Sequence, residues 1–163
     1  MLNNQNYKLV EQIEELSKAN YTGTIKITRA QSKALKTVNI GPKISFLVFA
    51  QGIIVYADDA ENSPQCLAKK IGQKFKINLI DRALITVKDK VKNENSFHEI
   101  FDLLARFGLV KSEELAEYIH NNIIITLEEI GDNLGNLEEY TDFNFDLNQE
   151  GLGLSWQEIK SRI

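Results

Sequence analysis

The sequence predicts an α+β fold, in which an N-terminal helix and an antiparallel sheet are interrupted in the sequence by an α-helical insertion of about four helices. The first observation is a change of apolar period, from helical to alternating near residue 24 and back to helical from residue 62. The second is a return to alternation at 142–148. Strand patterns on both sides of a helical block indicate a single sheet that is split by an insertion.

The N-terminal helix is predicted from one apolar stripe with three- and four-residue steps. The stripe consists of Leu9, Val10, Ile13 and Leu16. Charged residues fall on the other side of the helix. Asn20 and Gly23 tolerate left-handed backbone angles, so we expect the helix to end there.

Three strands are predicted next. Thr24–Thr28 alternates between polar and apolar residues, which indicates a half-buried strand. Ile44–Ala50 is apolar on both faces and is expected at the centre of the sheet. Gln51-Gly52 supplies a tight reversal into the third strand, Ile53–Ala57. The apolar residues of this hairpin are therefore expected to serve burial.

The helical insertion is expected to span about residues 63–133 and to contain four helices. Their predicted starts are Ser63, about residue 79, Ser96 and Ser112. Gly108 is expected to end the third helix and Gly131 the fourth. The inward-facing residues predicted for the fourth helix are Leu115, Ile119, Ile123, Leu127 and Ile130.

A last strand is predicted at 142–148, where Phe143, Phe145 and Leu147 share one face. Residues 1–150 are expected to form the domain, and 151–163 a linker or the start of a following helix. Within that tail, Ser155-Trp156-Gln157-Glu158 has the spacing of a capping box.

Composition excludes several classes of protein. The 163 residues carry a net charge of −4 and a single cysteine, so no internal disulfide can form and a cytoplasmic location is expected. The N-terminal residues lack a signal-peptide pattern. No run approaches the roughly 18 apolar residues that a membrane-spanning helix needs, so no membrane insertion is expected.

A search for reactive groups predicts no catalytic, cofactor-binding or metal site. Cys66 has no histidine near it in the sequence, and His98 and His120 lack the spacing of a zinc site. No glycine-rich phosphate loop follows a strand. Residues 107–112 join two predicted helices as in a helix-turn-helix, but the second helix carries glutamates where a DNA reader needs cations.

Charge is unevenly distributed along the chain. The connection 29–43 and the segment 69–92 are basic, whereas 128–150 contains acidic residues and no lysine or arginine. Basic patches favour encounter with an acidic partner. The predicted protein-interface residues are Lys33, Lys36, Lys88 and Lys90.

Two stretches, LVEQIEELSKANYTGTIKIT and ISFLVFAQGIIVYADD, carry a resemblance to a known family. The shared order is a helix, Thr22-Gly23-Thr24-Ile25 opening a strand, then Phe49, Gly52 and Ala57 in a hairpin, and finally Phe143-Asn144-Phe145. This order resembles the PATAN domain, the N-terminal domain of PatA-type cyanobacterial response regulators. The resemblance covers about residues 7–150, and the long basic connection at 29–43 departs from many relatives.

The resemblance implies a non-enzymatic regulatory protein–protein interaction domain of a two-component response regulator. Its expected role is to control type IV pilus motility or phototaxis by binding pilus motor components, such as a pilus ATPase or platform protein. The chain would be fused to, or cut from, a receiver domain. Two alternatives stay open at this point: a nucleic-acid-binding helical module and a small-ligand sensor domain.

Overall fold

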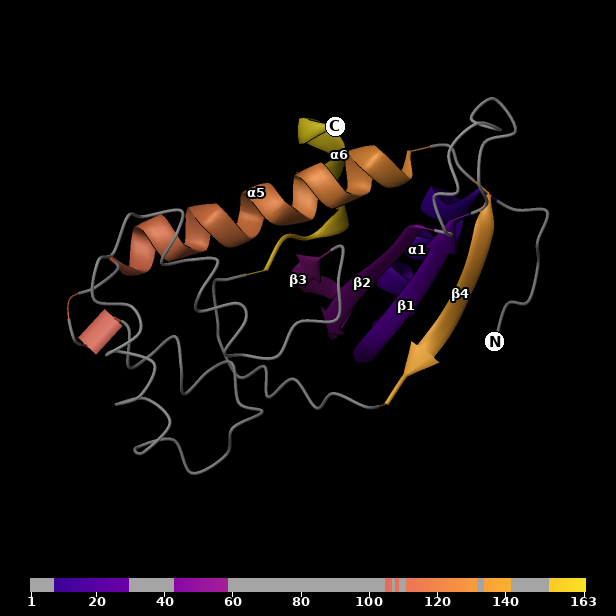
Figure 1. Cartoon of the computed structure of the whole chain (residues 1–163), viewed down its shortest axis with the longest axis horizontal. Coiled ribbons are helices and arrows are strands. Elements are labelled where there is room, and N and C mark those ends of the chain that lie inside the picture. Colours follow the sequence, from indigo (N-terminus) through magenta and orange to yellow (C-terminus); the bar gives the residue numbers. More distant parts are fainter. Residues whose placement is uncertain are drawn as a thin grey trace.

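The structure of the chain is a computed structural model. The structure describes residues 8–29, 43–58, 105–106, 108, 111–131, 134–141 and 153–163. These residues form an antiparallel four-stranded sheet with helices packed against it, which is an α+β arrangement (Figure 1).

The sheet has the strand order β3-β2-β1-β4, and every neighbouring pair is antiparallel. The strands are β1 at Gly23–Arg29, β2 at Lys43–Ala50, β3 at Ile53–Asp58 and β4 at Gly135–Tyr140. The first three confirm the strands predicted from the sequence to within two residues at each end. The central position predicted for β2 is also confirmed, because β2 lies between β1 and β3 and its residues 45–49 are buried without interruption.

The β2–β3 hairpin turns at Gln51 and Gly52, which have φ angles of 49° and 81°. A register shift between Val48 and Phe49 adds a bulge just before the turn. The backbone N–H of Gly52 donates to the carbonyl of Tyr21 at 2.8 Å, and the Ser17 hydroxyl donates to the Gly52 carbonyl. The reversal predicted at this glycine is thus fixed against the last turn of the N-terminal helix and the residues that follow it.

That helix, α1, spans Leu9–Lys18. Its predicted stripe is confirmed in outline, since Leu9 and Ile13 are fully buried and Val10 and Leu16 pack partly buried against the core. Asn20 follows in the left-handed region with a φ of 53°, as expected for a helix end.

The long helix α5 spans Ser112–Ile130. All five inward residues predicted for it are buried in the core, and Gly131 ends it with a φ of 45°. The helix begins at Ser112, the predicted start, but Ser112 is not its cap: the N-cap residue is Lys111, and no side chain caps the helix there.

The C-terminal helix α6 spans Trp156–Arg162, and the predicted capping box at its start is confirmed. Ser155 N–H donates to the Glu158 carboxylate at 2.7 Å, and Glu158 N–H donates to the Ser155 hydroxyl at 3.3 Å. Leu154, just before the helix, pairs with Ile54 of β3 through reciprocal backbone hydrogen bonds. Residues 153–163 therefore pack onto the same core as the sheet, whereas the domain limits predicted from the sequence stay a prediction.

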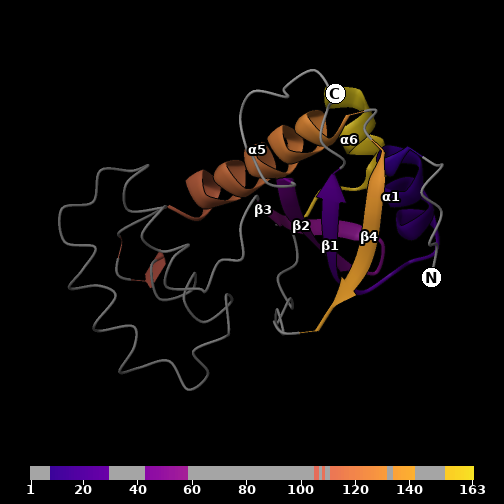
Figure 2. The same cartoon turned by 45° about the vertical axis from the view of Figure 1, so that its right-hand side comes forward.

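The three helices lie on the same side of the sheet (Figure 2). Arg29, which follows Ile25 and Ile27 on one face of β1, reaches the C-terminal end of α5. Tyr21, just after α1, packs edge-on against Phe49 of β2, with the two ring centroids 5.7 Å apart. The core between these layers includes side chains from all three helices and all four strands.

The predicted insertion of about four helices is wrong. The described residues contain three helices in total, and α5 is the one that falls within 63–133. Of the segments expected to form the other inserted helices, residues 63–104 lie outside the described residues. Ala105 and Arg106, at the expected end of the third helix, are helical, and Gly108 follows with a φ of 66°. An apolar period shows that a helix could bury one face, but most helical stability comes from tertiary packing, which the period does not specify.

The sequence also failed to predict β4. The strand expected at 142–148 lies outside the described residues, and the strand that joins β1 is Gly135–Tyr140. Leu137 is the one buried side chain of β4, because β4 is the edge strand and pairs with β1 through its backbone. A strand with so little apolar alternation gives no period-two signal.

Candidate functional site

The four lysines predicted as interface residues, Lys33, Lys36, Lys88 and Lys90, lie outside the described residues. The same holds for Cys66 and His98. Among the residues that are described, no three His, Cys, Asp or Glu side chains gather as metal ligands would. No described helix is both long enough and apolar enough to span a bilayer.

The most distinctive polar feature of the described surface is the side of α5 that points away from the core. Because an α-helix repeats every 3.6 residues, five exposed residues separated by steps of three and four fall on this side. They are Glu114, Glu117, Asn121, Ile125 and Glu128, which we call the outer face of α5. Ile125 is 52% exposed and lies between acidic residues along the helix.

The outer face is negatively charged, and no lysine or arginine of α5 offsets this charge. The helix contains five glutamates and no lysine or arginine. Glu114 and Glu117 are three residues apart, where like charges repel. Glu128 lies in the last turn, next to the negative end of the helix dipole. Among the described residues, no cation pairs with any of these three glutamates.

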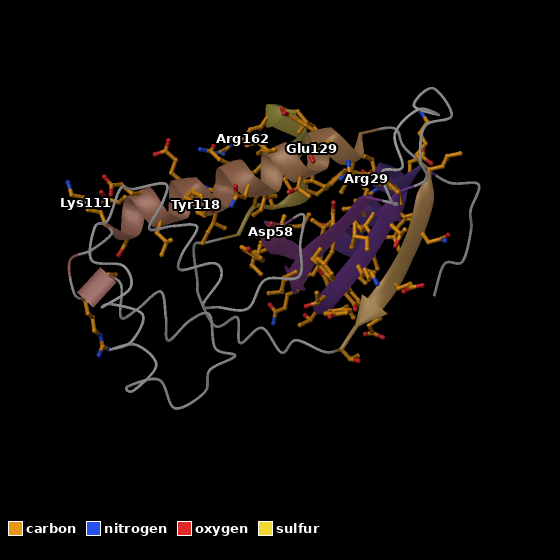
Figure 3. All side chains as sticks on the ribbon, viewed as in Figure 1. Arg29, Asp58, Lys111, Tyr118, Glu129 and Arg162 are labelled. Atoms are coloured by element: carbon orange, nitrogen blue, oxygen red, sulfur yellow. The ribbon has the colours of Figure 1, made fainter. Side chains whose placement is uncertain are left out.

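Arg29 fixes the C-terminal end of α5 to the sheet. Its guanidinium donates from Nη1 to the Glu129 backbone carbonyl at 2.9 Å and from Nη2 to the Ser45 hydroxyl at 3.2 Å. The Glu129 carboxylate lies 3.7 Å from Nη2 (Figure 3). Only 7% of the Arg29 side chain is exposed, so this contact is a structural link in the core rather than a binding group.

The short helix α6 is tied to α1 by charge. Lys160 of α6 lies 2.9 Å from Glu14 of α1, and Lys18 approaches the same carboxylate oxygen at 3.2 Å. The hydrogen bond from Lys160, followed by that from Lys18, lowers the pKa of Glu14. At the start of α6, the Ser155 backbone and side-chain hydrogen bonds lower the pKa of Glu158, and the charge of Arg162 adds a smaller effect in the same direction. The ion pair between Lys160 and Glu14 therefore joins α6 to α1.

A second polar contact joins the start of β1 to the edge strand. The Tyr21 hydroxyl donates to the Glu139 carboxylate at 3.0 Å. Burial of the phenol, and then the hydrogen bond and charge of Glu139, raise the pKa of Tyr21 to about 12. A raised pKa means that the folded state holds this proton more tightly than the unfolded chain does.

We therefore expect Tyr21 to titrate about two pH units above an ordinary tyrosine. The stability that the contact adds is fully present below pH 10 and is lost as the pH rises toward about 12, because the unfolded chain releases the proton first. Ultraviolet titration of the wild type against Tyr21→Phe isolates this residue, and Glu139→Gln is expected to lower its pKa. An unchanged pKa in Glu139→Gln would contradict the assignment.

The structure does not support the helix-turn-helix interpretation. α5 would be the recognition helix, yet its exposed residues Glu113, Glu114 and Glu117 face solvent at the N-terminal end that would enter a groove. Phosphates repel such a surface.

The sequence shows the acidic character of α5 but does not identify its outer face as a site. Which residues form the exposed side of a helix is known only once the buried residues are known. The role of Arg29 was also missed, since the residue was assigned to the basic connection 29–43. Comparison with known protein families, curated proteins and solved structures found no match to this chain.

Proposed function

We propose that this chain is a non-enzymatic protein–protein interaction domain of a two-component response regulator. In this proposal it acts in the cytoplasm and controls type IV pilus motility or phototaxis by binding a pilus motor component. The partner would be the pilus ATPase or the platform protein, and an attached receiver domain would control the binding.

One observation of the structure supports an interaction domain most directly. A 19-residue helix is held on a sheet by a continuous core and presents an exposed outer face that carries charges of a single sign. Unpaired like charges on a rigid element favour steering of a charged partner over internal stability. The regulatory and motility roles come from the PATAN resemblance of the sequence.

The predicted basic patches supply the first test. We expect the purified chain to bind the purified pilus ATPase or platform protein in biolayer interferometry, with an association rate that falls as salt rises. Replacing Lys33, Lys36, Lys88 and Lys90 together with glutamate should lower that rate by about tenfold or more. Binding that is unchanged in rate and salt dependence would remove these lysines from the interface.

The general proposal has its own test. Absence of binding to both pilus proteins would contradict the pilus role. A turnover activity of the purified chain, abolished by one substitution, would contradict a non-enzymatic role.

A further inference from the structure

We infer that the outer face of α5 is a docking surface for a cationic amphipathic helix of a partner protein. This inference rests on the proposed function and adds the chemistry of the partner. It concerns an acidic surface on the described part of the chain, separate from the basic lysines considered above.

The C-terminal half of the face offers an apolar contact. Ile125 is one of four large apolar side chains that are more than two-fifths exposed among the described residues, and it lies on the fourth turn of a helix whose other side is buried in the core. Its neighbour Ile124 is partly buried against the core. An exposed aliphatic side chain on a rigid element, surrounded by polar residues, is the arrangement of a small interface centre.

The charges on either side of Ile125 determine which kind of partner surface can bury it. Glu114 and Glu117 lie on the N-terminal side of Ile125 and Glu128 on the C-terminal side, with no lysine or arginine between them. A partner that lies along the whole face and buries Ile125 must approach these carboxylates, so an acidic or nucleic-acid surface would be repelled. Lysine or arginine side chains at both ends of an apolar stripe would pair with all three.

The length of the face indicates that the partner is a helix. Glu114 and Glu128 are 14 residues apart, or about 21 Å along the axis at 1.5 Å per residue. A second helix of four turns covers this length and satisfies its own backbone hydrogen bonds. An extended segment would need backbone partners, and the side of a helix provides none.

The probe is a fluorescein-labelled synthetic helical peptide of 18 residues, with a leucine stripe flanked at both ends by lysines on one face. We expect it to bind the full chain with micromolar affinity in fluorescence anisotropy, and to weaken as salt rises. A peptide of the same composition with the lysines distributed around the helix should bind at least about tenfold more weakly.

The decisive variant is the triple replacement Glu114→Lys, Glu117→Lys and Glu128→Lys, which should weaken peptide binding by about tenfold or more. Its matched control is Glu11→Lys, Glu15→Lys and Glu138→Lys, exposed acids on α1 and β4 that give the same change in net charge.

Two milder variants keep the test valid if the triple variant folds poorly, as judged by its urea midpoint. The glutamine versions of the same three residues should weaken binding less than the lysine versions. Ile125→Asn should weaken binding at high salt as well as low salt, because it removes an apolar contact.

Three outcomes would overturn the inference. They are no binding of the patterned peptide, equal losses in the α5 variant and the matched control, and a concentration-dependent dimer that the α5 variant abolishes, which would make a second copy the occupant. None of them contradicts the proposed function if the chain still binds a pilus component. Conversely, peptide binding without any pilus partner would support the docking surface while contradicting the pilus role.

Discussion

Replacing Gly52 with alanine is expected to lower the free energy of unfolding by about 3–5 kcal/mol. A Cβ atom at this position would lie 2.3 Å from the Ser17 backbone carbonyl oxygen, far inside van der Waals contact. The φ of Gly52 is +81°, which adds a conformational penalty for any residue with a side chain. Both effects act on the same turn.

The surrounding backbone leaves little room to relieve this overlap. Gly52 donates to the Tyr21 carbonyl and accepts from the Ser17 hydroxyl, so the turn and the end of α1 are joined by two hydrogen bonds. Moving the turn away from Ser17 would break both bonds. It would also shift Phe49 and Ile54, which are buried on either side of the turn.

Urea unfolding followed by far-ultraviolet circular dichroism measures the loss, and Gly108→Ala is the matched control. Gly108 also has a positive φ, of 66°, but a Cβ there would meet nothing within 4 Å. Its replacement should therefore cost only about 1 kcal/mol, the conformational penalty alone. Similar losses in the two variants would show that contact with Ser17 is not what requires glycine at 52.

The β2–β3 hairpin shows which structural features the local sequence can predict. Gln51-Gly52 predicts the reversal because turn geometry depends on adjacent residues. The close approach of Ser17 was beyond prediction, since it depends on how a helix 35 residues away packs over the turn. The strand β4 shows the same limit, because its place beside β1 rests on backbone pairing that leaves few apolar residues to detect.

The helices show a similar limit to what the period of apolar residues can predict. In α1 and α5 the apolar stripes predicted the buried residues, because one face of each meets the sheet. The same reasoning extended to an insertion of about four helices was wrong. A stripe tells which side of a helix would be buried, but not whether a partner surface exists to bury it.

The candidate site was less predictable than the fold. The density of charge along the sequence predicted lysines as interface residues. The outer face of α5 could not be predicted in this way, because it consists of the residues of the helix that are not buried. Ile125, in particular, looks like a core residue in the sequence, because it lies in the run Ile123-Ile124-Ile125. Only the packing of Ile123 inward sets Ile125 on the outside.

Replacing Arg29 with methionine is expected to lower the free energy of unfolding by about 2–3 kcal/mol. Methionine fills a similar volume, so the loss comes from hydrogen bonds rather than from a cavity. Without the guanidinium, the Glu129 carbonyl loses its donor at the end of α5, and the hydroxyl of Ser45, which is fully buried, loses the same partner. The ion pair with the Glu129 carboxylate contributes less, because that side chain is 37% exposed and the distance is 3.7 Å.

Two further variants separate these contributions in urea unfolding. Glu129→Gln keeps the backbone carbonyl and should cost less than about 1 kcal/mol. Adding Ser45→Ala to Arg29→Met should cost less than the sum of the two single losses, because neither member of the buried hydrogen bond between Arg29 and Ser45 is then left unpaired. A Glu129→Gln loss as large as that of Arg29→Met would instead place the stabilisation in the ion pair. In that case the link between α5 and the sheet would weaken with added salt, which a hydrogen bond between Arg29 and a backbone carbonyl would resist.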